Sequence, residues 1–191
     1  VPLEGESATR YRALAARCNY IAVDRADVQY CTQELCRDMS SPRIASWKRL
    51  VRLGLYFLGK PRAVIAFAWQ PEAASFDIFS DAKWAGCKTS RKWTSDGVVM
   101  LGRCCIKSWS KTQGTIAQSS AESELLAKVR GATEGLGFIS LAKDLGIELK
   151  VRLHVDAAAA LGIIERRGVG RVRHLDVGTP VAAGAAASQS Y

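Results

Sequence analysis

Four acidic side chains of this chain could together hold a divalent metal ion. Clustered carboxylates repel one another, which raises their pKa values unless a cation lies among them. Mg²⁺ or Mn²⁺ suits such a cluster, because hard cations take oxygen ligands and keep several waters. Two such ions about 4 Å apart can activate a water and stabilise the leaving oxygen of a phosphodiester. The residues in question are Asp81, Glu124, Asp156 and Asp176.

Two of these acids stand at the ends of expected β-strands. Residues 76–81 alternate in polarity with period two and end on Asp81, and residues 151–156 end on Asp156. A hairpin is predicted over residues 97–109, so the first three strands are expected to be antiparallel. If the strand at 151–156 lies parallel beside the first, both carboxylates meet at the carboxyl edge of the sheet. Open α/β sheets bind their ligands at that edge.

Helices are expected to position the other two acids. A long helix over residues 119–145 carries Glu124 in its first turns, and Ser119 and Glu122 have the spacing of a capping box. Asp176 follows a second predicted helix over residues 157–166. The alternation of strands and helices predicts an α/β fold with a mixed sheet flanked by helices. Taken singly, each acid also has an ordinary explanation, as a turn residue or as a charge near a helix N-terminus.

A small helical segment is expected before the sheet, over residues 1–60. Ser7 is a candidate N-cap for its first helix, and Ser41 with Pro42 for its last. Gly59 and the residues after it are expected to end that helix. Residues 64–69 then form an apolar run that is typical of a short strand.

Composition sets limits on the kind of protein. The chain has 191 residues, 48% of them hydrophobic, which suits one domain or one domain with a helical annex. Its formal net charge of +9 favours a polyanionic partner such as nucleic acid, although a basic protein without such a partner is the alternative. No apolar run is long enough to predict a membrane span.

The cysteines argue against a zinc site. None of the 6 cysteines forms a Cys-x-x-Cys pair, and the chain has 2 histidines, His154 and His174. Cys104 and Cys105 are adjacent and would point to opposite faces of a strand, which disfavours a mutual disulfide. Reduced, buried thiols fit a protein of the cytoplasm or nucleus.

Five strings of this chain occur in an order and spacing typical of one family. The chain resembles, from about Tyr11 to Val177, the C-terminal part of the polyprotein of copia-type LTR retrotransposons, including the segment before its RNase H domain. The strings that carry the resemblance are SDAKWAG at 80–86, RKWTSDG at 91–97, IKSWSKTQ at 106–113, SSAESELLA at 119–127 and VRHLDV at 172–177. In the family these strings look like SDADWAG, RKSTSGY, ISWKSKKQ, SSTEAEYMA and TKHIDIR.

The resemblance implies an RNase H-like fold and a metal-dependent endoribonuclease that hydrolyses the RNA strand of RNA–DNA hybrids. It implies that the four acids named above are the catalytic, metal-binding residues, with Glu124 rather than Glu122 as the catalytic glutamate. Basic side chains near them would contact phosphates, and a tryptophan could pack on a sugar or base. The expected substrate-binding residues are Ser80, Lys83, Trp84, Arg91, Lys92 and Lys111. Solvated surface is the alternative for the lysines, and a place in the core for Trp84 and Trp109.

The resemblance divides the chain into three expected parts. They are a helical connection segment at 1–60, an RNase H-like domain at 61–177 and a low-complexity tail at 178–191, expected to be a linker or disordered. After Asp156, alanines 157–160 stand where the family has polar residues that grip the hybrid. The favoured hypothesis is therefore a nuclease. The alternative is an inactive RNase H-like remnant that serves as a nucleic-acid-binding or structural protein-interaction module.

Overall fold

The computed structural model divides the chain into two units, Val1–Ala66 and Phe67–Tyr191. The structure describes residues 1–83, 93–115, 117, 119–154 and 186–188. Each unit has a hydrophobic core of its own, so each is described by itself. None of the described helices is long and apolar enough to cross a membrane. The predicted three-part division of the chain remains a prediction.

The first unit is helical, as predicted. It contains α1 (Gly5–Ile21), the 3-10 helix η1 (Ala26–Val28), α2 (Gln29–Arg37) and α3 (Ile44–Gly59). Two of the predicted helix starts are wrong by a few residues. α1 begins at Gly5, ahead of Ser7, because the φ of +55° at Gly5 turns the chain there. Arg43 rather than Ser41 is the N-cap of α3, and its backbone N–H donates to Ser46 Oγ at 3.3 Å.

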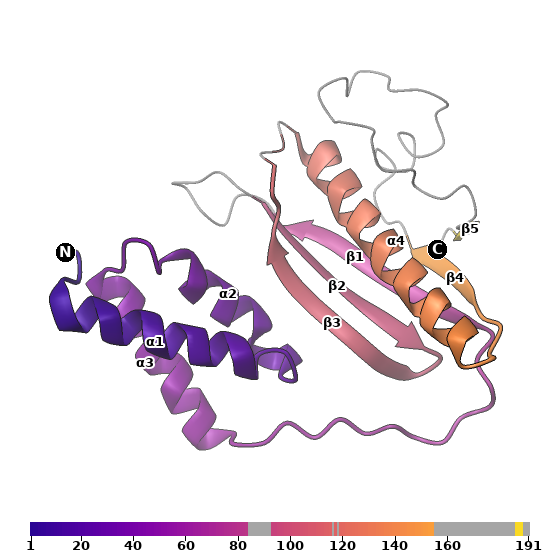
Figure 1. The fold of residues 1–191 in the computed structure, drawn as a ribbon, viewed down its shortest axis with the longest axis horizontal. Coiled ribbons are helices and arrows are strands. Elements are labelled where there is room, and N and C mark those ends of the chain that lie inside the picture. Colours follow the sequence, from indigo (N-terminus) through magenta and orange to yellow (C-terminus); the bar gives the residue numbers. More distant parts are fainter. Residues whose placement is uncertain (84–92, 116, 118, 155–185, 189–191) are drawn as a thin grey trace. The chain divides into compact units, whose positions relative to one another are not determined.

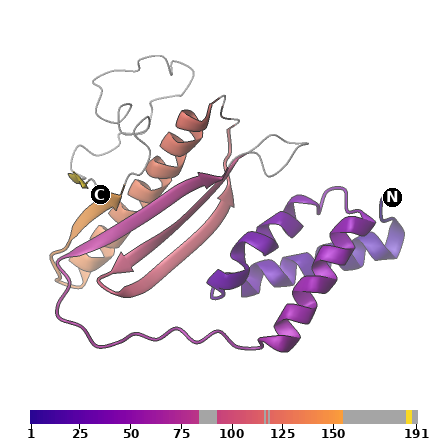
Figure 2. The ribbon, with the colours of Figure 1, turned by 180° about the vertical axis from the view of Figure 1, so that it is seen from behind.

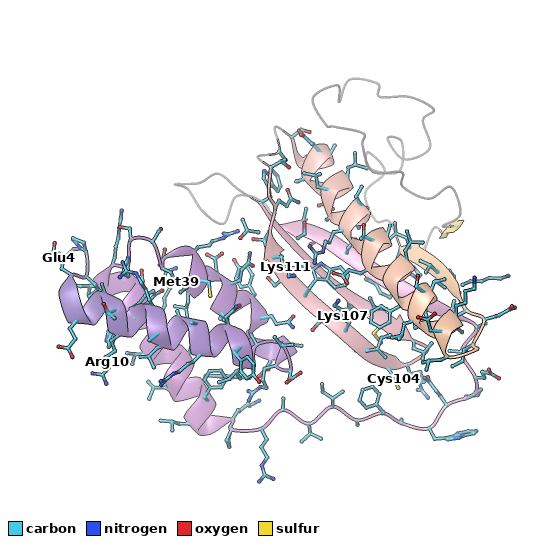
Figure 3. The ribbon with its side chains drawn as sticks, viewed as in Figure 1. Glu4, Arg10, Met39, Cys104, Lys107 and Lys111 are labelled. Atoms are coloured by element: carbon cyan, nitrogen blue, oxygen red, sulfur yellow. The ribbon has the colours of Figure 1, made fainter. Side chains whose placement is uncertain are left out.

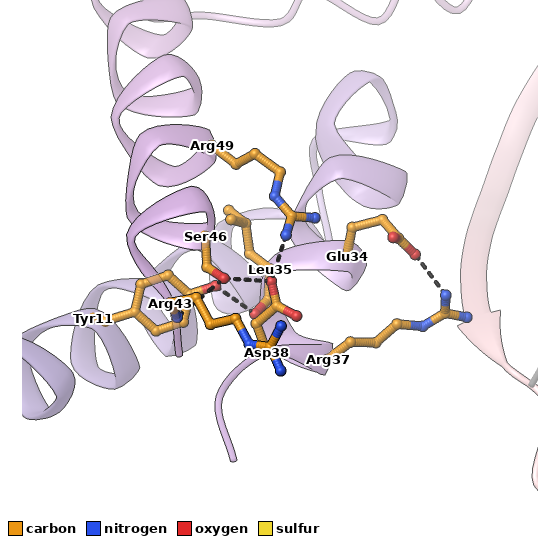
Figure 4. A network of polar contacts seen from close by, with 8 residues as sticks. All are labelled: Tyr11, Glu34, Leu35, Arg37, Asp38, Arg43, Ser46 and Arg49. Carbon is orange, nitrogen blue, oxygen red and sulfur yellow. Dashed lines mark hydrogen bonds and ion pairs between the residues drawn. The ribbon is translucent and has the colours of Figure 1, made fainter. Parts of the chain in front are cut away.

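A cluster of polar contacts joins α1, α2 and α3 of this unit (Figure 4). Tyr11 is fully buried, and its hydroxyl donates to the carbonyl oxygen of Leu35 at 2.8 Å. Burial raises the pKa of Tyr11 to about 12, and the nearby Asp38 carboxylate adds to the effect. Asp38 in turn accepts from Ser46 Oγ at 2.7 Å and from Arg49 at 2.8 Å, both on α3. Polar contacts therefore add direction to a core that is otherwise apolar.

The second unit is built on a mixed sheet with the order β3-β2-β1-β4-β5. β1 pairs antiparallel with β2, β2 pairs antiparallel with β3, and β1 pairs parallel with β4. The predicted hairpin and the predicted parallel pair are both confirmed. The strands are β1 (Ser75–Lys83), β2 (Thr94–Leu101), β3 (Cys104–Thr112), β4 (Lys150–His154) and β5 (Ala186–Ser188).

Two expectations about strands are wrong. Residues 64–69 form no strand, and Val64 and Trp69 are 89% and 90% exposed. The run is apolar, but no strand among the described residues pairs with it. The tail at 178–191 contains a strand at Ala186–Ser188, where a linker or disordered end was expected. That segment pairs in parallel with β4.

One face of the sheet is covered by α4 (Ser120–Asp144), which crosses it obliquely (Figure 1). The opposite face carries no described helix of this unit (Figure 2). The helix comes close to β1 because Gly131 and Gly135 face it, and a Cβ on Gly131 would lie 3.2 Å from Ile78 Cγ2. The helix is continuous through both glycines.

An ion pair fixes the middle of α4 against the hairpin. Lys107 on β3 lies 2.6 Å from Glu134, which also pairs with Arg130 one helical turn away at 2.8 Å. Burial acts to raise the pKa of Glu134, but the hydrogen bonds from Lys107 and Arg130 outweigh it and lower that pKa. The Lys107 ammonium also lies 5.9 Å from the centre of the Phe138 ring.

Gly97 provides a test of packing between β2 and β3. A Cβ at Gly97 would collide with the indole of Trp109, which is 5% exposed and lies opposite Gly97 in the ladder. We expect Gly97→Ala to lower the free energy of unfolding by about 1–3 kcal/mol, because the indole cannot move without opening the core. Denaturant titration of the purified chain measures this change.

Gly54 on α3 is the matched control, because a Cβ there meets nothing within 4 Å. Gly54→Ala should raise helix stability by about 0.5–1 kcal/mol, since alanine loses less backbone entropy on folding. Equal effects of the two substitutions would contradict this account of Gly97.

Acid should weaken the first unit through Asp27. Arg25 donates to both carboxylate oxygens of Asp27, at 2.9 and 2.8 Å, and these bonds lower the pKa of Asp27 from 3.8 to about 2. Because the pKa is lowered, the charged Asp27 stabilises the fold at pH values above the pKa of the unfolded state. This contribution is lost as pH falls from about 4 to about 2. Asp27→Asn should therefore make the pH dependence of unfolding shallower in that window, as followed by helical circular dichroism. Asp24→Asn, at an exposed position, should leave it unchanged.

Candidate functional site

The first predicted ligand, Asp81, lies near the carboxyl end of β1. Its ladder partner on β2 is another acid, Asp96. Asp81 is exposed, whereas its neighbours Ser80 and Ala82 are buried on the side of the sheet that α4 covers. Asp81 has no hydrogen bond or ion pair to another described side chain, so its oxygens remain open to solvent or to a ligand.

Glu124 lies in the first turns of α4, as predicted. Ser119 is the N-cap, and its hydroxyl oxygen accepts from the backbone N–H of Glu122 at 3.2 Å. Glu122 is 3% exposed and belongs to this start of the helix, whereas Glu124 is half-buried. The two glutamates therefore differ in environment, and Glu122 takes part in the N-cap of the helix.

Gln113 joins the start of α4 to the strand ends. The sequence motifs did not predict this role. Its side-chain nitrogen donates to Ser95 Oγ on β2 and to the carbonyl oxygen of Ser123 on α4, each at 2.9 Å. Gln113 is 8% exposed, so both bonds are buried. Ser123 directly precedes Glu124, and Ser95 directly precedes Asp96. In the sequence Gln113 is only the last residue of the string at 106–113, and its burial is known from the structure alone.

Lys128 is a second tie between α4 and β1. It is 1% exposed, and its ammonium donates to the carbonyl oxygen of Ser80, the residue before Asp81. Lysine is almost never buried to this degree without polar partners, because its charge is strongly hydrated in water. Since Lys128 stands one turn after Glu124, the contact holds the helical acid and the strand acid at the same end of the sheet.

The end of β4 is held beside β1 by contacts on the face of the sheet opposite α4. His154 Nε2 lies 2.9 Å from Asp77 Oδ1, and the His154 ring stacks on Phe79 with centroids 4.2 Å apart. Phe79 and His154 are ladder partners. These contacts fix the last described residue of β4 next to β1, two residues before Asp156 in the sequence.

The other predicted site residues have different outcomes. Lys111 is exposed on β3 (Figure 3), and Ser80 is buried beneath α4. Trp109 is a core residue, which confirms the alternative expectation for it. The residues that lie outside the described part of the chain, or whose side chain does, are Lys83, Trp84, Arg91, Lys92, Asp156 and Asp176.

Among the described residues, no group of three or more His, Cys, Asp or Glu side chains could hold a metal ion. Two of the four predicted ligands lie outside that part of the chain, so the metal site stays a prediction. The five described cysteines are free thiols, and burial raises the pKa of Cys18 and of Cys36.

Comparison with known proteins identifies relatives of part of the chain. No family model matches it. An uncharacterized mitochondrial protein of Arabidopsis thaliana is 30% identical over 125 residues, which cover 65% of this chain and 51% of that protein. The secreted RxLR effector protein 161 of Plasmopara viticola is 30% identical over 124 residues, which cover 65% of this chain and 87% of that protein.

The chain belongs to the same family as the Plasmopara viticola protein. It spans about half the length of the Arabidopsis thaliana relative. Neither name states an enzymatic activity, so activity has to be argued from the residues themselves.

Gln113 offers a test of how the site is held together. Gln113→Ala leaves the hydroxyl of Ser95 and the carbonyl of Ser123 without this donor in a buried place. We expect a loss of about 1–3 kcal/mol in the free energy of unfolding, and faster amide exchange in the first turns of α4 than in its last turns. Thr115→Ala, two residues on and exposed, is the control and should change neither quantity. Uniform exchange along α4 in the Gln113 variant would contradict the tie.

Proposed function

We propose that the chain is the RNase H-like part of a copia-type retrotransposon polyprotein, and that it hydrolyses the RNA strand of RNA–DNA hybrids with Mg²⁺ or Mn²⁺. The observation that carries the proposal is the parallel register of β1 and β4. Phe79 is level with His154 in that ladder. Asp81 comes two residues after Phe79, and Asp156 comes two residues after His154.

Continuation of the same register by two residues on each strand would bring the two aspartates level. Neighbouring strands lie about 4.8 Å apart, so two carboxylates that are level on them could ligate the same ion. The proposal therefore rests on the register of β1 and β4, whose continuation would bring the two acids level, and on the helix that is tied to β1.

Glu124 supports the proposal through the contacts of its helix. Lys128 joins α4 to the backbone of Ser80, and Gln113 joins the turn before Glu124 to β2. Both contacts are buried, so they keep the start of α4 over the end of β1. Catalytic groups need to be held within about 0.5 Å of their working geometry, and buried supports of this kind provide such rigidity.

The donor chemistry fits a hard divalent ion. Asp81 and Glu124 would supply carboxylate oxygens, and Asp156 and Asp176 are the further carboxylates that the resemblance implies. When bound, such an ion supplies an activated water and stabilises the charge that develops on the leaving oxygen. The net charge of +9 and exposed lysines such as Lys111 would attract and hold the phosphates of the hybrid.

Cleavage of a labelled RNA–DNA hybrid tests the proposal. We expect the full chain to cut the RNA strand in the presence of Mg²⁺ or Mn²⁺ and not in the presence of a chelator. Asp81→Asn should reduce the rate by at least about 100-fold, because it removes a charged ligand oxygen while keeping the side-chain shape. Asp144→Asn, the same change at the far end of α4, should leave the rate unchanged.

Two results would sink the nuclease proposal. One is the absence of any metal-dependent cleavage, and the other is equal cleavage by the native chain and by Asp81→Asn. Binding of the hybrid that survives in either case, measured at several salt concentrations, would instead support a non-catalytic nucleic-acid-binding module.

A further inference from the structure

The helical unit contains a pocket that the proposed cleavage does not use. Its volume is about 490 Å³, within the range of about 300–1,000 Å³ that is usual for small-molecule sites. The floor is apolar and is formed by Val28, Leu35 and Leu53, which are buried core residues of the unit. Residues of η1, α2 and α3 line it, so the pocket lies entirely within one unit.

Most charged groups in the lining are already paired. Asp27 accepts from Arg25 at 2.8 and 2.9 Å. Glu34 pairs with Arg37 at 2.7 Å, and Arg49 pairs with Asp38 at 2.8 Å (Figure 4). The three partners of these lining residues stand outside the lining, so each pair cancels a charge without occupying the pocket.

Arg52 is the exception in this lining. It projects from α3, is exposed, and has no ion-pair partner within the described part of the chain. The pocket therefore carries one uncompensated positive charge. A guanidinium presents a planar fork of donors that matches a phosphate or a carboxylate in two-point contact.

Two tyrosines add flat walls to the pocket. Tyr30 on α2 and Tyr56 on α3 are each 37% exposed and line it. The Tyr56 hydroxyl donates to Asp27 Oδ2 at 2.8 Å, so its ring is held in place by a carboxylate that Arg25 also holds. A ring fixed before binding loses little entropy when a second ring stacks on it. Aromatic side chains of this kind bind the faces of nucleobases without regard to sequence.

We infer that this pocket binds a planar aromatic ring with one phosphate group, the chemistry of a mononucleotide. The ring would lie over the apolar floor against Tyr30 and Tyr56, and the phosphate would contact Arg52. A phosphate is favoured over a carboxylate because it carries about −1.5 to −2 charge at pH 7, and the chain as a whole is basic, with a net charge of +9. Nucleotide binding here is independent of any cleavage by the second unit.

Isothermal titration calorimetry of the full chain with adenosine 5′-monophosphate tests the inference. We expect a dissociation constant between about 10 µM and 1 mM. Adenosine, which lacks the phosphate, and ribose 5-phosphate, which lacks the ring, should each bind at least about 10-fold more weakly. A 5′-phosphorylated oligonucleotide distinguishes the two sources of this chemistry, since tighter binding than by the monophosphate indicates a strand end.

Two substitutions locate the binding, each with a matched control. Arg52→Gln should weaken binding of the monophosphate about 10-fold and leave that of adenosine unchanged, because only the phosphate contact is lost. Arg10→Gln, at an exposed position on α1 outside the pocket (Figure 3), should change neither. Tyr30→Leu should weaken both ligands about 5- to 100-fold, whereas Tyr20→Leu, at an 82% exposed tyrosine outside the lining, should have no effect.

Circular dichroism of each variant separates loss of the pocket from loss of the fold. No binding heat with the monophosphate at 10-fold above the expected range overturns the inference. Equal affinity of the native chain and Arg52→Gln for the monophosphate overturns it as well. Neither outcome bears on cleavage of RNA–DNA hybrids, which is measured separately.

Discussion

The second unit depends on the hydrogen bonding of β1 along both of its edges. β2 pairs with it antiparallel on one side and β4 pairs with it parallel on the other. A parallel neighbour needs a crossover, and α4 supplies it by returning over one face of the sheet. Ile78, at the centre of β1, is fully buried beneath that helix. Every candidate active-site residue that the structure describes is therefore positioned relative to this one strand.

Buried polar contacts fix the position of α4 more closely than strand pairing and apolar packing do. Lys128 on α4 donates to the backbone of β1. Gln113 donates to a hydroxyl oxygen on β2 and to the backbone of α4. These bonds restrict how the helix can slide along the sheet. In the first unit the half-buried Asp38 accepts from Ser46 and from the exposed Arg49, beside the buried Tyr11. Such contacts cost desolvation energy, but they are directional, which apolar packing alone is not. In the first unit they also leave Arg52 as the charge that the pocket presents.

The two units divide the chemistry of the chain. The sheet places Asp81 opposite Asp96, and the helical unit has arginines and tyrosines around an apolar pocket floor. Membership of a family with the Plasmopara viticola protein establishes common descent for about two-thirds of the chain. It does not carry an activity with it, because function resides in particular side chains rather than in the fold.

Local patterns in the sequence determined most of the elements. Alternating polarity identified β1, a glycine turn identified the β2–β3 hairpin, and a capping serine identified the start of α4. These signals succeed because they act between residues close together in the chain. The same reasoning failed at residues 64–69 and at Ala186–Ser188, where strand formation depends on whether a distant segment offers a partner. Only the tertiary structure decided that Gln113 and Lys128 join α4 to the strands, and that Arg52 lines a pocket without an ion-pair partner among the described residues. Burial and pairing of side chains far apart in sequence leave no local pattern from which they could be read.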